Sequence, residues 1–422
     1  MDENVLNKLK ILAESAKYDV SCSSSGTVRS GKAGMLGNTV GGWGICHSFA
    51  EDGRCISLLK VMLTNYCIYD CAYCINRRSN DLPRATLSVA ELVDLTMEFY
   101  RRNYIEGLFL SSGVVRNPDY TMERLVRVAK DLRTIHRFNG YIHLKSIPGA
   151  SRELVNEAGL YADRLSVNVE IPKEENLKLL APEKDHKSVY APMRYIQQGV
   201  LESSEERKKH RHAPRFAPAG QSTQMIVGAT SESDKDILYL SSALYGRPTM
   251  KRVYYSGYVS VNTYDTRLPA LKQPPLVREN RLYQADWLLR FYQFKVDEIV
   301  DDAYPDLDLE IDPKLSWALR HPEQFPVDIN KADYEMLLRV PGIGVKSAKL
   351  IVASRRFSRL GFYELKKIGV VMKKAQYFIT CRELPLQMQT VNELSPQRVR
   401  TLLLPKPKKK VDDRQLILDF GE

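Results

Sequence analysis

Strand-like runs alternate with helix-like segments through the middle of this chain. Six runs have the composition of strands, and they lie at 55–63, 107–113, 141–146, 164–170, 223–229 and 251–255. Helix-like segments such as 88–102 and 121–135 lie between most of them. This alternation predicts a parallel sheet, because parallel neighbours need a long crossover that is usually a helix. The predicted fold class is α/β, a partial (β/α)6 barrel of the TIM type, short of the complete eight units.

The flanking segments predict further parts of the chain. Residues 1–54 begin with a short amphipathic helix and continue into a Gly/Ser-rich segment that contains cysteines and is typical of a loop. The barrel is expected over 55–300, where a long helix with an apolar face closes it. Residues 301–326 are expected to be a linker, 327–384 a small all-α domain, and 385–422 a basic tail.

The bulk composition narrows the classes of partner and compartment. The 422 residues carry a formal net charge of +11, which favours an anionic partner, nucleic acid before an anionic membrane surface. No apolar run approaches the ~18–20 residues that span a bilayer. The start, MDENVLNKLK, lacks the pattern of a secretory signal. We therefore expect a cytoplasmic protein with no membrane partner, in which clustered cysteines indicate metal binding or catalysis before disulfides.

Three of the seven cysteines form a cluster, Cys67, Cys71 and Cys74, with the spacing C-x3-C-x2-C. A structural zinc site usually takes four protein ligands, and there is no second C-x2-C pair. A redox dithiol would use Cys71 and Cys74 but leave Cys67 unexplained. The remaining alternative is a [4Fe–4S] cluster held by three thiolates, which leaves one iron open for a ligand that is not protein.

The CxxxCxΦC spacing, with Tyr73 at the aromatic position, resembles the radical S-adenosylmethionine (radical SAM) superfamily. The resemblance implies that the open iron chelates the methionine part of S-adenosylmethionine. It also implies that the reduced cluster cleaves this cofactor to a 5′-deoxyadenosyl radical, which abstracts hydrogen from a substrate. Such chemistry needs an enclosed interior that excludes water, with the cofactor supplying the difficult step. An external electron donor is implied as well.

Later positions match the superfamily less closely. Ser111, Ser112 and Gly113 stand where the family has a Gly-Gly-Glu turn for the methionine amino group, and this sequence lacks the carboxylate. Asn168 and Glu170 share one face of a strand and resemble the residues that contact ribose and methionine. The alternative is a strand end with ordinary polar residues. Gly228 resembles the glycine that lets adenine approach the backbone.

Four cysteines lie outside the cluster. Cys22, Cys46 and Cys55 precede it in the chain and could bind a second iron–sulfur cluster, as the resemblance allows. They could equally be buried side chains that fill space. Cys381 is expected in a core.

The stretch LLRVPGIGVKSAKLI, within 327–353, resembles a helix-hairpin-helix motif, a module for sequence-independent binding to the DNA backbone. Glycines are expected to open its turn, and a helix to begin at about residue 345. The N–H groups at a helix start attract phosphate. The residues expected to contact nucleic acid are Pro341, Gly342, Ile343, Gly344, Val345, Lys346 and Lys349. A structural or protein-binding use of the hairpin is the alternative.

A weaker copy of this motif follows at 365–379. Leu365, Ile368, Gly369 and Ala375 are matched with Leu338, Ile343, Gly344 and Ala348, with slippage in the hairpin. The copy predicts a paired unit that grips both strands of a duplex. The tail ends in QLILDF, which resembles the peptide that docks on the sliding clamp, with Gln415, Leu416, Leu418 and Phe420 as anchors.

The whole pattern resembles a family of radical SAM proteins ascribed to DNA modification or repair, in which the barrel is joined to a helix-hairpin-helix module. The resemblance implies an enzyme that acts on a DNA base, and a base in a duplex would have to be flipped out. Two alternatives stay open. One is an enzyme that modifies RNA, and the other is a non-enzymatic DNA-binding protein with a structural cluster, which would be expected to use four cysteines.

Overall fold

The structure is a computed structural model that describes residues 2–18, 44–49, 55–382 and 395–404. The chain divides into two compact units, Met1–Tyr283 and Gln284–Glu422, which are considered one at a time. In the described parts of the chain, every helix falls short of the length or the hydropathy that a membrane span requires.

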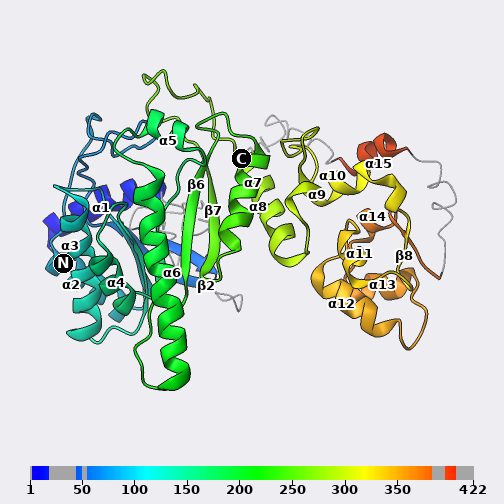
Figure 1. Cartoon of the computed structure of the whole chain (residues 1–422), viewed down its shortest axis with the longest axis horizontal. Helices are drawn as coiled ribbons and strands as arrows, with labels where there is room; N and C mark the ends of the chain where they lie inside the picture. Colours follow the sequence, from blue (N-terminus) through cyan, green and yellow to red (C-terminus); the bar gives the residue numbers. More distant parts are fainter. Residues whose placement is uncertain (1, 19–43, 50–54, 383–394, 405–422) are drawn as a thin grey trace, which may run out of the picture. The chain divides into compact units, whose positions relative to one another are not determined.

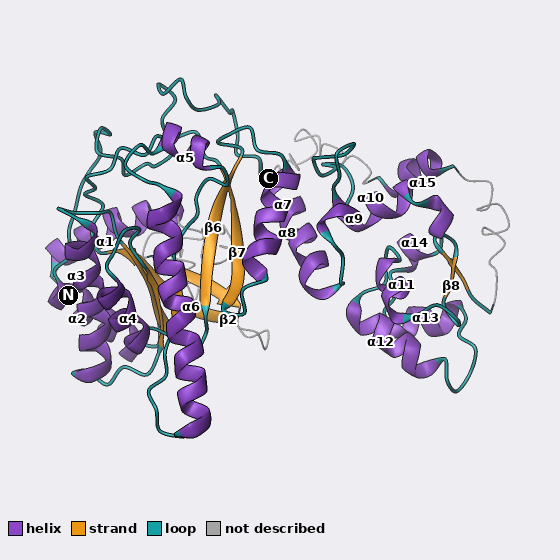
Figure 2. Ribbon diagram, in the orientation of Figure 1, coloured by secondary structure: helices purple, strands orange, loops and turns teal. Residues whose placement is uncertain are grey.

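The first unit is built on one seven-stranded sheet whose strands follow the order of the chain. The first pair is antiparallel, and all later pairs are parallel. The sheet curls into an open half-barrel (Figures 1 and 2). Its strands are β1 (Ile45–Phe49), β2 (Cys55–Met62), β3 (Gly107–Ser111), β4 (Tyr141–Lys145), β5 (Arg164–Ser166), β6 (Gln221–Val227) and β7 (Met250–Gly257). The α/β prediction and the six expected strands are confirmed. The antiparallel β1 was not predicted, because it comes directly after a Gly-rich stretch.

Helices precede the sheet, connect its parallel strands and follow its last strand (Figure 2). They are α1 (Glu3–Ser15), α2 (Val89–Arg101), α3 (Pro118–Thr134), α4 (Arg152–Tyr161), α5 (Glu174–Leu180), α6 (His186–Lys209), α7 (Asp234–Tyr245) and α8 (Leu276–Phe291), which continues into the second unit. Local sequence fixes several of their starts. Ser88 and Glu91 form a capping box on α2, and the Asn117 side chain caps α3 ahead of Pro118.

The two faces of the sheet differ in polarity. Residues at alternate positions, such as Leu59, Val61, Leu108 and Leu110, are fully buried apolar side chains. The other face carries buried polar residues, among them Lys60, His143, Ser166, Asn168 and Gln224. Strand alternation makes this inner face polar, with an apolar floor of Cys46, Leu58 and Phe109. The fold therefore has a polar interior, and its functional residues are expected at the carboxyl ends of the strands.

The second unit is mostly helical. It holds α9 (Val296–Ile299), α10 (Pro313–Arg320), α11 (Tyr334–Arg339), α12 (Val345–Ser354), α13 (Phe362–Ile368), α14 (Met372–Ala375) and α15 (Pro396–Leu403). A short parallel pair, β8 (Val327–Asp328) and β9 (Ile379–Thr380), joins the two ends of the segment that contains α11 to α14. Helix α10 lies inside the segment 301–326 that was expected to be a linker.

Two helical pairs in this unit are related by a shift of 27 residues in the sequence. Gly342 and Gly369 have φ angles of 90° and 91°, so they occupy the same place in their turns. Leu338 and Leu365 are both fully buried, as are Ala348 and Ala375. The expected slippage was therefore wrong: Gly369 corresponds to Gly342 rather than Gly344, Val370 corresponds to Ile343, and Val371 stands where Gly344 does. The two turns meet where the Val371 N–H donates to the Gly342 carbonyl at 2.9 Å.

Candidate active site

The three clustered cysteines lie on the loop that leaves the carboxyl end of β2. Cys71 is buried, and Cys67 and Cys74 are partly exposed. A turn joins the last two, because the Cys74 N–H donates to the Cys71 carbonyl at 3.0 Å. The other predicted cofactor residues end or follow neighbouring parallel strands, Ser111, Ser112 and Gly113 at β3, Asn168 and Glu170 after β5, and Gly228 after β6. They therefore share one edge of the sheet with the cysteine loop.

The segment after β3 passes directly beside Cys67. The Val114 N–H donates to the Cys67 Sγ at 3.4 Å, and the Ile68 N–H donates to the Val114 carbonyl at 2.8 Å. Gly113 makes this approach feasible, because a Cβ there would lie 2.2 Å from the Tyr66 carbonyl oxygen. The glycine thus allows the two loops to meet.

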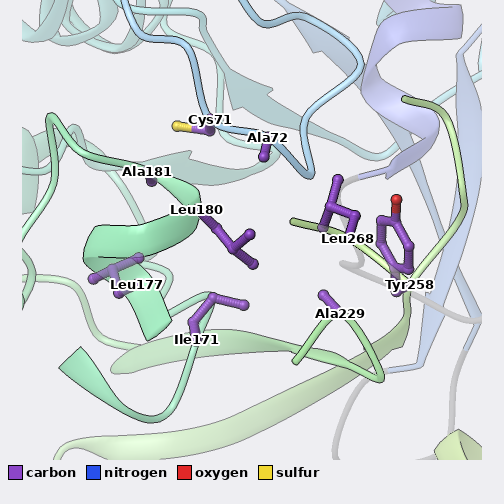
Figure 3. Close-up of a cluster of buried hydrophobic side chains, with 9 residues drawn as sticks. All are labelled: Cys71, Ala72, Ile171, Leu177, Leu180, Ala181, Ala229, Tyr258 and Leu268. Carbon is purple, nitrogen blue, oxygen red and sulfur yellow. The ribbon is translucent and has the colours of Figure 1, made fainter. Parts of the chain in front are cut away.

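An apolar cluster packs around the cysteine loop (Figure 3). Cys71 and Ala72 contact buried side chains that follow β5, β6 and β7, namely Ile171, Leu177, Leu180, Ala181, Ala229, Tyr258 and Leu268. Tyr73 and Cys74 pack against the same cluster. The Ala72 N–H donates to the Leu180 carbonyl at 2.7 Å. This packing removes the inner side of the cysteine loop from water.

A buried ion network holds the outer side of the loop. Arg77 is 5% exposed and makes a bidentate contact with Asp70, at 2.9 and 2.7 Å. Asp70 lies between the first two cysteines of the C-x3-C-x2-C motif. Its third nitrogen donates to Asp265, after β7, at 2.8 Å. The hydrogen bond from Arg77 holds the pKa of Asp70 well below its usual range, and Arg267 with Arg77 does the same for Asp265. The network joins the cysteine loop to the last segment of the barrel.

Two further polar side chains fix backbone carbonyls of this loop. The Asn262 amide donates to the carbonyls of Ala72 and Cys74. Arg84 donates to four carbonyls, those of Asn65, Asn76, Arg77 and Asn80. The conformation of the cysteine loop is therefore set from both of its ends before any cofactor binds.

Lys184, between α5 and α6, is a cation that contacts the cysteine loop. Its ammonium lies 3.5 Å from the Tyr73 hydroxyl and over the ring of that residue. Burial opposes its charge, but the neighbouring thiols, Tyr73 and Glu170 outweigh burial and raise its pKa well above the ordinary value. The same segment contacts the loop again, because Glu183 accepts the Asp70 N–H at 3.2 Å.

The environment of Cys71 and Cys74 favours the neutral thiol over the thiolate when no metal is bound. Burial raises the pKa of Cys71, and Lys184 opposes the shift. Burial, followed by the charges of Cys71 and Cys67, raises the pKa of Cys74 to about 12. A positively charged centre bound between the sulfurs would reverse both effects.

Asn168 and Glu170 lie side by side with residues of β4 and β6. The Asn168 amide donates to Gln224 at 3.3 Å, and the Glu170 carboxylate lies 4.0 Å from the Lys145 ammonium. Glu170 has a φ of 64°, and its carbonyl accepts the Ile226 N–H. Lys145, Asn168 and Gln224 also line a small polar cavity, with His143 and Tyr254. The structure therefore brings the predicted polar pair to the interior of the half-barrel.

The residues after β3 and β6 have distinct settings. Ser111 is 1% exposed, and its hydroxyl has no hydrogen-bond partner among the described residues. The Ser112 hydroxyl donates to the Gly113 carbonyl. Gly228 has a φ of 84°, and a Cβ there would lie 3.0 Å from Pro275.

The expected second cluster gains no further support from the positions of its cysteines. Cys46 is buried in β1 opposite Leu58, on the floor of the half-barrel. Cys55 begins β2, at the end opposite the cysteine loop, and Cys22 lies outside the described residues. Cys381 is partly exposed. The second cluster remains a prediction.

The hairpin residues of the second unit surround the start of α12. Pro341 and Ile343 are buried, whereas Lys346 and Lys349 are exposed. Tyr292 is hydrogen-bonded to the backbone of Val345, and its hydroxyl faces Gly344. The Ile343 carbonyl accepts the Lys314 ammonium at 2.5 Å. The Val345 backbone, which was expected to face a phosphate, is therefore already hydrogen-bonded to Tyr292.

The predicted clamp peptide lies outside the described residues. Its expected anchors are Gln415, Leu416, Leu418 and Phe420.

The sequence of the first unit matches a known family. Residues 61–201, from the end of β2 into α6, match the model of the Radical SAM superfamily. The chain contains a radical SAM domain. Such a domain uses a [4Fe–4S] cluster and S-adenosylmethionine. The comparison with curated proteins found no match.

Three solved structures are similar to part of this chain. One is HydG, a maturase of the [FeFe]-hydrogenase, with 15% identity, a TM-score of 0.41, and coverage of 54% of this chain and 48% of that chain. Another is methylornithine synthase (PylB), with 14% identity, a TM-score of 0.40, and coverage of 55% and 60%. The third is coproporphyrinogen III oxidase (HemN) from Escherichia coli, described as a radical SAM enzyme, with 14% identity, a TM-score of 0.34, and coverage of 61% and 56%. The chain thus spans between about half and three fifths of these proteins.

The residues of the radical SAM domain fit the two cofactors. In the described parts of the chain, no three His, Cys, Asp or Glu side chains converge to hold one metal ion. In a [4Fe–4S] cluster each thiolate binds its own iron, so three cysteines need not converge on one point. The N–H aimed at Cys67 and the unpartnered buried hydroxyl of Ser111 are polar groups that suit a bound cluster and its second ligand.

Several residues of this site were not found from the sequence. Arg77, Arg84, Lys184, Asn262 and Asp265 support the cysteine loop but stand in no short motif. The clearest available signal was the polar run NRRSND at 76–81, two residues after Cys74, because charged residues close to metal ligands commonly orient them.

Proposed function

We propose that this chain is a radical SAM enzyme that modifies or repairs DNA. One observation carries the proposal: the radical SAM domain shares its chain with a strongly basic segment built from two similar helical turns. Between Val340 and Arg382 the sequence has ten lysine or arginine residues and one acidic residue, Glu364. A basic surface of this kind favours a polyanionic partner.

Each part of the cysteine loop has a task in this proposal. Cys67, Cys71 and Cys74 would hold the cluster, and the Val114 N–H would stabilise the charge on the Cys67 sulfur. When bound, the cluster and S-adenosylmethionine supply a 5′-deoxyadenosyl radical that can abstract a hydrogen atom. The apolar residues around Cys71 would exclude water from this region.

Residues at the carboxyl ends of β3 to β6 would orient S-adenosylmethionine. Its methionine carries one amino and one carboxylate group, and the side chains offer both kinds of partner. Glu170 is an acceptor for an amino group, and Lys145 is a donor for a carboxylate. Ser111 offers a buried hydroxyl that still lacks a partner among the described residues. These side chains compensate for the carboxylate that is absent from the turn at 111–113.

The paired turns of the second unit would bind the DNA backbone without reading its sequence. Their shared geometry at Gly342 and Gly369 supports a paired module, and the exposed Lys346 and Lys349 on α12 support contact with phosphate. For this contact, the hydrogen bond between Tyr292 and the Val345 backbone would have to break, so that a phosphate oxygen could take the place of the Tyr292 hydroxyl. Binding at the sliding clamp through residues 415–420 remains a prediction.

The proposal is tested by a comparison of substrates. The anaerobically reconstituted protein is incubated with dithionite, S-adenosylmethionine and either duplex DNA, single-stranded DNA or transfer RNA. We expect DNA to increase the yield of 5′-deoxyadenosine and to yield an altered nucleoside by mass spectrometry. A double variant, Lys346→Glu with Lys349→Glu, should lose only the part of the yield that depends on DNA. A yield that no nucleic acid changes would refute the DNA substrate, and turnover with transfer RNA alone would favour the RNA alternative.

A further inference from the structure

Phe357, in the loop between α12 and α13, is 90% exposed, more than any other large apolar side chain in the described residues. The loop residues Arg356, Ser358 and Arg359 around it are exposed as well. A phenylalanine gains free energy when its ring leaves water, so full exposure on an ordered loop favours a role in contact with a partner.

The exposure of Phe357 is built into the loop. Arg355 donates to the carbonyls of Ile329 and Ala332, and Leu360 is 2% exposed. The Asn330 side chain clasps Leu360, accepting its N–H at 2.8 Å and donating to its carbonyl at 3.1 Å. Both ends of the loop are thus fixed to the segment 329–332, and the four residues between them project outward with little freedom.

The surroundings of Phe357 indicate the chemistry of the partner. Arg356 and Arg359 are exposed residues of the same loop, one position before and two positions after Phe357, and Lys346, Lys349 and Leu350 are exposed on α12, which leads to the loop. Residues 346, 350 and 353 recur at helical spacing, so they lie along one side of α12, and Phe357 follows the end of this helix at Ser354. A partner that matches this surface carries negative charge and a flat apolar face. An unpaired nucleic-acid base has both, since its ring stacks on an aromatic side chain while its phosphates meet arginine.

We propose that Phe357 stacks on an unpaired or unstacked DNA base, with Arg356 and Arg359 on the adjoining phosphates. This inference rests on the proposed function, and it adds that the second unit prefers DNA with a local distortion. Backbone contacts alone would bind an intact and a distorted duplex alike. The Phe357 ring would distinguish the two duplexes, because it can stack on a base that has lost its stacking neighbour in the distorted duplex.

Fluorescence anisotropy with the full chain tests the inference. The probes are a labelled 30-base-pair duplex, the same duplex with a central three-base bulge, and an RNA duplex with the same bulge. We expect the wild type to bind the DNA bulge more tightly than the intact duplex. Phe357→Ala should weaken binding to the bulge by about tenfold, within the range measured for loss of one stacked base, and leave binding to the intact duplex unchanged. Phe357→Trp should restore the preference.

Controls separate this inference from the proposed function. Tyr304→Ala removes another exposed aromatic ring of the same unit and should change nothing. Equal binding of the bulge by the wild type and Phe357→Ala would overturn the inference while DNA binding stands. A wild type that binds none of the DNA probes would overturn the proposed function as well. A preference for the RNA bulge over the DNA bulge would contradict the commitment to DNA.

Discussion

Arg77 donates to Asp265 at 2.8 Å across 188 residues of sequence, with both side chains almost fully buried. The contact joins the loop that carries the three cysteines to the segment that follows the last strand. Together with the bidentate contact to Asp70, it attaches the cysteine loop firmly to the rest of the half-barrel.

Replacement of Arg77 should release the cysteine loop. In Arg77→Met the carboxylates of Asp70 and Asp265 lose a buried partner, and breaking such a contact costs about 3 kcal/mol. We expect a lower melting temperature and several-fold less iron bound per chain after anaerobic reconstitution. Lys130→Met, which removes the exposed pair with Glu157, is the matched control and should retain full iron binding. Normal iron binding by Arg77→Met would show that the network does not position the cysteines.

Gly113 should tolerate no side chain. A Cβ would lie 2.2 Å from the Tyr66 carbonyl oxygen and 3.3 Å from the Cys67 Cβ, so Gly113→Ala must push the two loops apart. We expect weaker binding of S-adenosylmethionine by calorimetry and a changed cluster spectrum, with the circular dichroism of the fold retained. Gly246→Ala is the control, because the nearest atom to its new Cβ is 3.3 Å away at a helix end. Equal behaviour of the two variants would contradict this account of Gly113.

The charge of Lys184 should tune the cluster. A cation near the thiolates stabilises the more negative, reduced state, so its removal should make the reduction potential more negative. At an effective dielectric constant of about 20, a unit charge about 10 Å from the cluster shifts the reduction potential by tens of millivolts. The measurement is potentiometric titration followed by electron paramagnetic resonance of Lys184→Met. Lys187→Met, at an exposed position of the same segment, should leave the potential unchanged, and a shift equal to that of Lys184→Met would remove the argument for a local effect.

Lys314 predicts a pH dependence of stability in the second unit. Burial lowers its pKa from 10.5 to about 7, with Asp312 opposing this shift and Lys374 and Arg339 adding to it. Between these values the unfolded chain binds a proton that the folded chain does not, so stability rises with pH from about 7 to about 10. The slope is at most about 1.4 kcal/mol per pH unit. We expect the melting temperature of the wild type to rise over this range relative to Lys314→Met, and parallel curves would contradict the assignment.

The sequence predicted the elements whose signals are local. Six strands were found because each is a short β-rich run between helical segments, and the cysteine loop was found because its spacing is specific. The register of the second helical turn was wrong, because that copy lacks the proline and one glycine. The positive φ of Gly369, together with the buried Leu365 and Ala375, shows that it corresponds to Gly342.

Contacts between distant segments could not be predicted in the same way. Nothing in the run NRRSND indicates that Arg77 meets Asp265, since either arginine of the run and many acidic residues would satisfy a pairing rule. Lys184 likewise stands among other lysines, and only the turn after α5 brings it to Tyr73. These residues depend on how the half-barrel closes, which is a property of the whole sheet.

The transfer of hydrogen from DNA to the cofactor tests the central claim most directly. The reconstituted wild type is given dithionite, S-adenosylmethionine and duplex DNA that is deuterated at carbon, with Cys71→Ala as the control without a competent cluster. We predict that the wild type forms 5′-deoxyadenosine that contains deuterium and that Cys71→Ala forms none. Unlabelled 5′-deoxyadenosine alone, or no product from a protein with an intact cluster, would contradict the account.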